Sequence, residues 1–164
     1  MRWNSKLSAW FAVESGVLQA GVRSPSMVNV FVNLFIVNIV RSGFGSHLNN
    51  LSMACLMYAD DLVLFSASVY DLQRLLDICS STADSLSLKC NCQKSSCLTL
   101  GHRYNDVIEP MTIGIGVNDW CSNVKYLGGL IKSARHLVTD IDVTVRKFIY
   151  RLMPCLVFVS VQTS

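Results

Sequence analysis

The sequence predicts an α+β fold in which helices pack on an antiparallel sheet. Stretches with strand-like alternation and stretches with helix-like spacing are mixed along the chain without strict alternation. The 164 residues suffice for one domain with its own core. Apolar residues make up 51% and charged residues only 15%, whereas soluble domains carry about 25% charged residues. This composition excludes a disordered chain and indicates apolar surface that another domain or partner covers.

The first part of the chain predicts a helix and an acidic hairpin. A strand at 10–13 and a polar, glycine-containing loop at 16–23 come before them. Ser24-Pro25 is typical of a helix start, and the helix should run from Pro25 to about Val40. Two apolar runs, 53–58 and 62–65, then flank Ala59-Asp60-Asp61, which predicts a β-hairpin with carboxylates at its tip.

The second part predicts one further helix, several strands and a final basic helix. Apolar residues three and four apart from Leu72 to Leu86 form one helical stripe. Strands are expected at 96–100 and 111–117, with a strand or hairpin at 124–131. A stripe from Leu137 to Leu152 predicts a helix whose other face is basic. The apolar tail after Pro154 has no predicted element.

Charge is distributed unevenly along the chain. Residues 58–122 hold four basic and eight acidic residues, whereas residues 123–164 hold six basic and two acidic ones. An acidic centre beside basic segments suits a metal site between phosphate-binding surfaces. Ordinary variation of surface charge explains the same distribution.

Asp60 and Asp61 stand between apolar strands, where adjacent carboxylates need a cation or a partner to neutralise them. Carboxylate oxygens are ligands that Mg²⁺ prefers, usually shared with substrate phosphates. An acidic surface turn is the alternative interpretation.

The seven cysteines form no regular framework, which favours reduced thiols in an intracellular protein, nuclear or cytoplasmic. No apolar run is long enough for a membrane span, and the N-terminus does not resemble a secretory signal. A zinc module at Cys90, Cys92, Cys97 and His102 is a competing hypothesis, but its spacing departs from the usual paired cysteines. We expect these cysteines to pack as small apolar residues.

Four segments together resemble the reverse transcriptases of non-LTR (LINE-like) retrotransposons. They are the glutamine loop and helix start at 16–25, the Tyr-Ala-Asp-Asp hairpin at 58–65, the Asn…Lys-Ser segment at 91–95 and the Tyr-Leu-Gly hairpin at 124–128. Their order matches that family, and the resemblance covers about residues 3–152. It implies a partial polymerase palm over 1–131, and the start of a thumb helix with a tail over 132–164.

The resemblance implies RNA-directed DNA polymerisation, a nucleotidyl transfer with two Mg²⁺ ions, an RNA template and a DNA primer. Asp60 and Asp61 would be catalytic metal ligands, and Lys94 would supply a proton or charge to the pyrophosphate. The other implied roles are template and nucleotide binding by Gln19, Gly21, Ser24 and Tyr58, primer binding by Tyr126, Leu127 and Gly128, and backbone binding by Arg146, Lys147 and Arg151.

The chain also departs from the family pattern. The family's first catalytic aspartate is expected upstream of the glutamine loop, but Glu14 is the only acidic residue before Gln19. Ala20 also stands where that loop usually has glycine. We therefore expect an N-terminally truncated fragment that is inactive alone, with a missing fingers segment or another chain covering its apolar surface. The alternative is a non-catalytic remnant that binds nucleic acid or protein.

Overall fold

A computed structural model describes residues 2–3, 6–7, 24–49, 51–59, 61–127, 129–136, 138–139 and 155–163. The elements in chain order are β1 (Arg2–Trp3), β2 (Lys6–Leu7), α1 (Ser24–Ser42), β3 (His47–Leu48), β4 (Leu51–Ser52), β5 (Cys55–Tyr58), β6 (Asp61–Ser66), α2 (Val69–Ser85), β7 (Leu88–Thr99), β8 (Met111–Ile113), β9 (Gly116–Asn118), β10 (Asn123–Tyr126), β11 (Gly129–Lys132), β12 (Val138–Thr139) and β13 (Cys155–Thr163).

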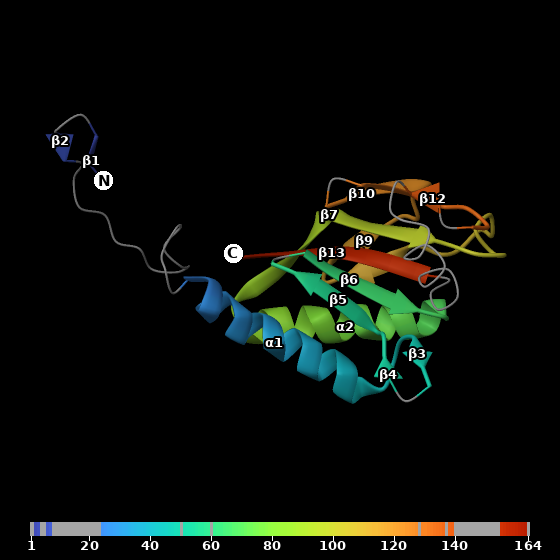
Figure 1. Cartoon of the computed structure of the whole chain (residues 1–164), viewed down its shortest axis with the longest axis horizontal. Coiled ribbons are helices and arrows are strands. Elements are labelled where there is room, and N and C mark those ends of the chain that lie inside the picture. The colour runs from blue at the N-terminus through green and yellow to red at the C-terminus, as the bar shows by residue number, and fades with distance from the viewer. Residues whose placement is uncertain are drawn as a thin grey trace.

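The centre of the fold is a four-stranded sheet in the order β5-β6-β13-β7, in which every neighbouring pair is antiparallel. Both helices lie along one face of this sheet, as Figure 1 shows. The predicted α+β class, with helices on an antiparallel sheet, is therefore confirmed. The predicted acidic hairpin is also present, as β5 and β6.

The main core lies between the sheet and the helices. Phe35 and Ile39 of α1 meet the apolar stripe of α2, and both pack against Leu62 and Leu64 of β6. Each of these side chains is at most 1% exposed. Strand β6 has buried side chains on both faces, as expected for a strand inside a covered sheet.

A second core covers the other face of the sheet. Val63 and Phe65 of β6 and Leu98 of β7 pack against Val124 of β10 and Ile131 of β11. Strands β10, β11 and β12 form a separate three-stranded antiparallel sheet on this side, shown in Figure 1. The fold thus has three layers, and β6 lies in the middle one.

The helix ends follow from local chemistry. Helix α1 begins at Ser24, one residue before the predicted first helical position, and is followed by Gly43 and Gly45, both with positive φ. A Cβ on Gly45 would lie 2.6 Å from the Cβ of Ala54, so glycine lets the chain approach the sheet. Helix α2 is capped by Ser68, whose hydroxyl accepts a hydrogen bond from the Asp71 N–H at 3.0 Å.

The predicted single strand at 111–117 is wrong, because the structure forms a hairpin there. Strands β8 and β9 pair through Ile113 and Gly116, which leaves Gly114 and Ile115 as a two-residue turn. Gly114 has a φ of 59°, a left-handed conformation that suits glycine. The alternation holds within β8, where Met111 and Ile113 are buried, but the exposed Ile115 belongs to the turn.

The predicted helix from Leu137 is contradicted at its start. Val138 and Thr139 form β12 and pair with the preceding strand β11, and this pairing overrides the helical spacing. Residues 140–154 lie outside the described residues. The tail, for which the sequence predicted no element, forms β13 in the middle of the main sheet, so this part of 132–164 belongs to the sheet of 1–131.

Within the described ranges, neither helix combines the length and apolar character that crossing a membrane requires.

Candidate active-site cleft

The β5–β6 connection is a tight turn that places Asp61 at the start of a buried strand. Tyr58 pairs directly with Asp61, so two residues, Ala59 and Asp60, make the turn. Ala59 has a φ of 54°, as turns of this length commonly require of their central residues. Asp60 itself lies outside the described residues.

The β10–β11 connection repeats this arrangement. Tyr126 pairs with Gly129, and the two residues between them are Leu127 and Gly128. Leu127 has a φ of 47°, whereas Gly128 lies outside the described residues. Two non-glycine residues therefore hold left-handed conformations at neighbouring hairpin tips. Such conformations cost on the order of 1–2 kcal/mol each and concentrate at functional sites.

Strand β7 presents Lys94 through an irregularity in its pairing. Phe158 of β13 pairs with Ser96 and Ser160 pairs with Asn91, so residues 92–95 are opposed by Val159 alone. The Lys94 N–H donates to the Asn91 side-chain oxygen at 3.1 Å. The Ser95 hydroxyl donates to the Asn91 carbonyl at 2.7 Å. The predicted Asn…Lys-Ser segment is thus a hydrogen-bonded excursion that holds an exposed lysine.

A buried amide fixes this excursion to the next hairpin. Asn118 of β9 is 7% exposed and its side-chain N–H donates to the Ser95 carbonyl at 2.6 Å. Buried amides are stable only when hydrogen-bonded. The position of Lys94 therefore depends on contacts with residues far away in the sequence.

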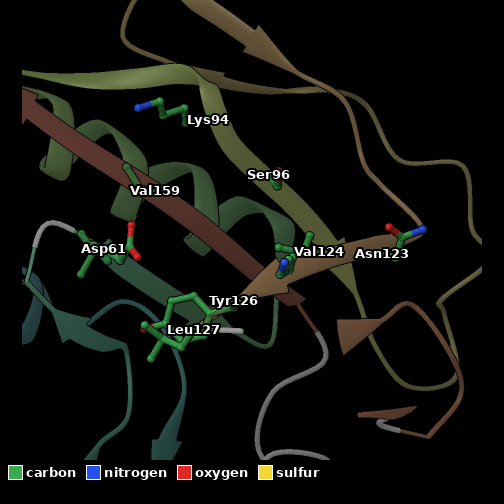
Figure 2. Close-up of a pocket in the computed structure, with 10 residues that line it drawn as sticks. Asp61, Lys94, Ser96, Asn123, Val124, Tyr126, Leu127 and Val159 are labelled. Carbon is green, nitrogen blue, oxygen red and sulfur yellow. The ribbon is translucent and has the colours of Figure 1, made fainter. Parts of the chain in front are cut away.

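These segments meet at an open cleft of about 230 Å³. Asp61 of β6 and Lys94 of β7 lie on opposite sides of β13, and Figure 2 shows Tyr126 and Leu127 close to Asp61. Three separately predicted segments, the acidic hairpin, the lysine segment and the Tyr-Leu-Gly hairpin, thus contribute to one site. The remaining lining residues are Leu62, Ser96, Asn123, Val124, Lys125 and Val159.

The charges in this cleft are not neutralised by salt bridges within the described part of the chain, where the sole ion pair joins Arg103 to Asp106. Asp61 is half-buried and Lys94 and Lys125 are exposed. Burial, and then the negative charge of Asp61, raise the pKa of the Tyr126 phenol above its ordinary value. The negative charge of Asp61 therefore disfavours the ionised form of Tyr126.

This arrangement suits a phosphate-bearing ligand held with a divalent cation. Lysine ammonium groups bind phosphate oxygens, and Mg²⁺ commonly takes one or two carboxylates with the remaining oxygens from phosphate and water. Asp61 supplies one carboxylate to the cleft. Across the residues with described positions, no three acidic, histidine or cysteine side chains cluster as a metal site. The described donors of the cleft therefore suit one ion that also takes oxygens from a ligand.

The other predicted site residues lie elsewhere or outside the described residues. Tyr58 ends β5 on the same hairpin as Asp61, is 63% exposed and does not line the cleft. Ser24 begins α1. The predicted residues outside the described part are Gln19, Gly21, Asp60, Gly128, Arg146, Lys147 and Arg151.

Several lining residues were not predicted as site residues. Lys125 and Asn123 had a signal, because Lys125 lies within the predicted segment 124–128 and Asn123 directly precedes it. Ser96 follows the lysine segment closely. No sequence signal pointed to Val159, since its place depends on the pairing of the tail with β6 and β7.

The zinc hypothesis is not supported. Cys97 is fully buried in the sheet, and this burial, together with neighbouring Cys121, raises its pKa to about 12. Zinc binds the thiolate, which such burial disfavours. Cys97 belongs to the main core, and Cys90 and Cys92 pack against that core. The expectation that these cysteines pack as small apolar residues is confirmed.

Comparison with known proteins relates the chain to a family. A family model described as "Reverse transcriptase (RNA-dependent DNA polymerase)" matches residues 1–131. That range includes Asp61, Lys94, Tyr126 and Leu127 of the cleft. No curated protein and no solved structure matches the chain.

Proposed function

Because the chain belongs to the reverse transcriptase (RNA-dependent DNA polymerase) family, we propose that its cleft binds a DNA primer on an RNA template. The observation that carries this proposal is the meeting of Asp61, Lys94 and Tyr126 in one open cleft. The three come from segments that are separate in sequence, and each brings a different group. A carboxylate, an ammonium group and a phenol together suit a phosphodiester, a cation and a primer end.

Each residue would have its own task in the cleft. Asp61 would be a ligand of Mg²⁺, which when bound neutralises phosphate charge and activates the primer hydroxyl. Lys94 would bind the phosphates that leave as pyrophosphate, since its side chain is exposed and unpaired by salt bridges within the described residues. Tyr126 and Leu127 would orient the primer end beside Asp61.

The non-LTR type is also part of the proposal. Its support is the sequence of the glutamine loop at 16–25 and of the acidic and Tyr-Leu-Gly hairpins. The segment with Arg146, Lys147 and Arg151 would bind the nucleic acid backbone, because clustered basic residues track phosphates regardless of sequence.

Binding without catalysis is proposed for the 164 residues alone. The part of the cleft that is described offers the carboxylate of Asp61 alone, and Asp60, the preceding residue in the sequence, would add a second. Two divalent ions bring four positive charges, for which polymerases need further carboxylates. Members of such a metal centre act as a unit, so an incomplete centre loses most activity.

The test is binding of oligo(dT) annealed to poly(rA), measured by fluorescence anisotropy at several salt concentrations. Lys94→Gln should weaken binding by about 3- to 10-fold and reduce the salt slope by about one, the effect of losing one phosphate contact. Lys89→Gln is the matched control, because Lys89 is exposed on β7 but does not line the cleft.

Equal binding by both variants would contradict the proposed site. Primer extension by the same chain with Mg²⁺, if abolished by Asp60→Asn, would contradict the proposed inactivity while leaving the site itself supported. The two outcomes therefore separate binding from catalysis.

A further inference from the structure

Strands β6 and β7 leave a gap one strand wide between them. Both are antiparallel to β13, so they run parallel to each other, and α2 joins the end of β6 to the start of β7. Strand β13 fills the gap, as Figure 1 shows. It comes from the far end of the chain and is not part of the β6-α2-β7 unit.

The gap cannot stay empty in a stable fold. An unfilled gap would expose the backbone N–H and C=O groups of two strands. It would also uncover Leu62 and Leu64 of β6, which are at most 1% exposed. Val159 of β13, opposite Leu62 and 2% exposed, completes this core. The fold therefore requires some strand at this position, but the β6-α2-β7 unit does not provide it.

Connections between parallel strands of one sheet are nearly always right-handed. By this rule, a strand other than β13 could also occupy the position between β6 and β7. Helices α1 and α2 lie on one face of the sheet. A right-handed crossover on a given face of a sheet leads to the next strand on one side. It leads to the other side when the first strand runs in the opposite direction. Since β6 crosses through α2 to β7, a strand that preceded α1 and ran parallel to β5 would lie two places from β5. That place is the one that β13 occupies.

The pairing of β13 is also imperfect. Its register on β7 shifts between Phe158 and Ser160, where four residues of β7 face one residue of β13. On β6 the pairing is continuous from Cys155 to Ser160. The irregularity lies in β7, where hydrogen bonds from Asn91 and Asn118 hold residues 92–95, so the ladder that holds β13 is continuous on the β6 side only.

We propose that the gap between β6 and β7 is a strand-acceptor site, and that β13 is its exchangeable occupant. The ligand class is an extended apolar peptide that runs antiparallel to both strands. Because Ser160 pairs with Asp61 and Val159 lines the cleft, exchange changes what lies next to the carboxylate. The proposal stands on topology and does not depend on polymerase activity.

The experiment locks β13 in place in the full chain. Cys155 pairs with Ser66, and opposite residues of antiparallel strands have Cα atoms about 4.5–5.5 Å apart, within the range for a disulfide. Ser66→Cys should therefore form a disulfide to Cys155 on mild oxidation. A dye-labelled peptide of residues 155–163, with Cys155→Ser, is the probe. It should bind the reduced variant at least about tenfold more tightly than the oxidised one.

Ser81→Cys is the control, because Ser81 is exposed on α2 and oxidation there should not alter peptide binding. A scrambled peptide should not bind. No binding to the reduced variant, or equal binding to both forms, would overturn the proposal.

Hydrogen exchange on the unaltered chain gives a second measurement should Ser66→Cys fail to fold. Excess peptide should release β13, so residues 155–163 lose amide protection while β6 keeps it. Unchanged protection of residues 155–163 under saturating peptide would overturn the proposal equally.

Discussion

Ala59 and Leu127 hold left-handed backbone conformations at two hairpin tips beside one cleft. Neither is glycine, so each Cβ is strained by its neighbouring carbonyl. The strain is local, and the pairing of Tyr58 with Asp61 and of Tyr126 with Gly129 enforces it. Each turn places its neighbouring residue, Asp61 or Tyr126, directly at the cleft.

Ala59→Gly should therefore stabilise the protein. Removing the strained Cβ should raise the free energy of unfolding by about 0.5–1 kcal/mol, after allowing for the greater flexibility of the unfolded chain. Urea denaturation measures the change. Ala67→Gly is the matched control, because Ala67 is exposed and lacks a positive φ, so this variant should lose stability. Loss of stability in both variants would argue against strain at Ala59.

Asp61→Asn should lower the pKa of Tyr126. The negative charge of Asp61 helps to raise that pKa, and the amide removes this contribution while burial still acts. NMR titration of labelled tyrosine rings measures it, with Asp77→Asn on α2 as control. In the wild type the unfolded phenol ionises first, near pH 10. The free energy of unfolding should therefore fall as the pH rises above that value. An unchanged Tyr126 pKa would show that the charge of Asp61 does not influence the phenol of Tyr126.

At the scale of elements, the excursion in β7 depends on Asn91. Its side chain accepts from the Lys94 N–H and its carbonyl accepts from the Ser95 hydroxyl. Asn91→Ala should cost about 1 kcal/mol of stability and weaken primer–template binding as Lys94→Gln does. The double variant should bind no worse than either single one, because both changes act on the same contact. Additive losses would show that Asn91 acts separately from Lys94.

Sequence predicted best the elements whose signals are local. The Ser24-Pro25 helix start, the apolar stripe of α2 and the two turns that flank Asp61 and Tyr126 depend on neighbouring residues only. For Lys94 the local part of the signal is the Asn91–Ser95 segment, while Asn118 of β9 adds a contact from 23 residues away. Only the family resemblance implied that these segments share a site, and the structure brings three of the four to one cleft.

The remaining elements were missed for different reasons. The tail from Cys155 to Thr163 is apolar without clear alternation, and its place is set by β6 and β7. Val138 and Thr139 follow helical spacing but pair with β11. At 111–117 the alternation was correct, but a turn at Gly114 interrupts it. Val159 belongs to this tail, so its place in the lining of the cleft could not be predicted either.

For the whole molecule, the cleft lies between two layers. Asp61, Lys94 and Val159 belong to the central sheet, whereas Tyr126 and Lys125 belong to the smaller sheet. The apolar contacts of Val63, Phe65 and Leu98 with Val124 and Ile131 hold the layers together directly beneath the site. Packing of these layers therefore assembles the charged groups, and any weakening of that contact should separate them.

Binding of Mn²⁺ in the presence of dTTP tests most directly whether this cleft is a metal and phosphate site. Electron paramagnetic resonance counts the bound ion in the wild type, Asp61→Asn and the control Glu109→Gln, whose glutamate is exposed and outside the cleft. We expect dTTP to strengthen Mn²⁺ binding in the wild type and in the control. Asp61→Asn should weaken it by about tenfold or more, since even indirect metal partners contribute that much. Equal Mn²⁺ affinity in all three proteins would show that Asp61 is not part of a metal site.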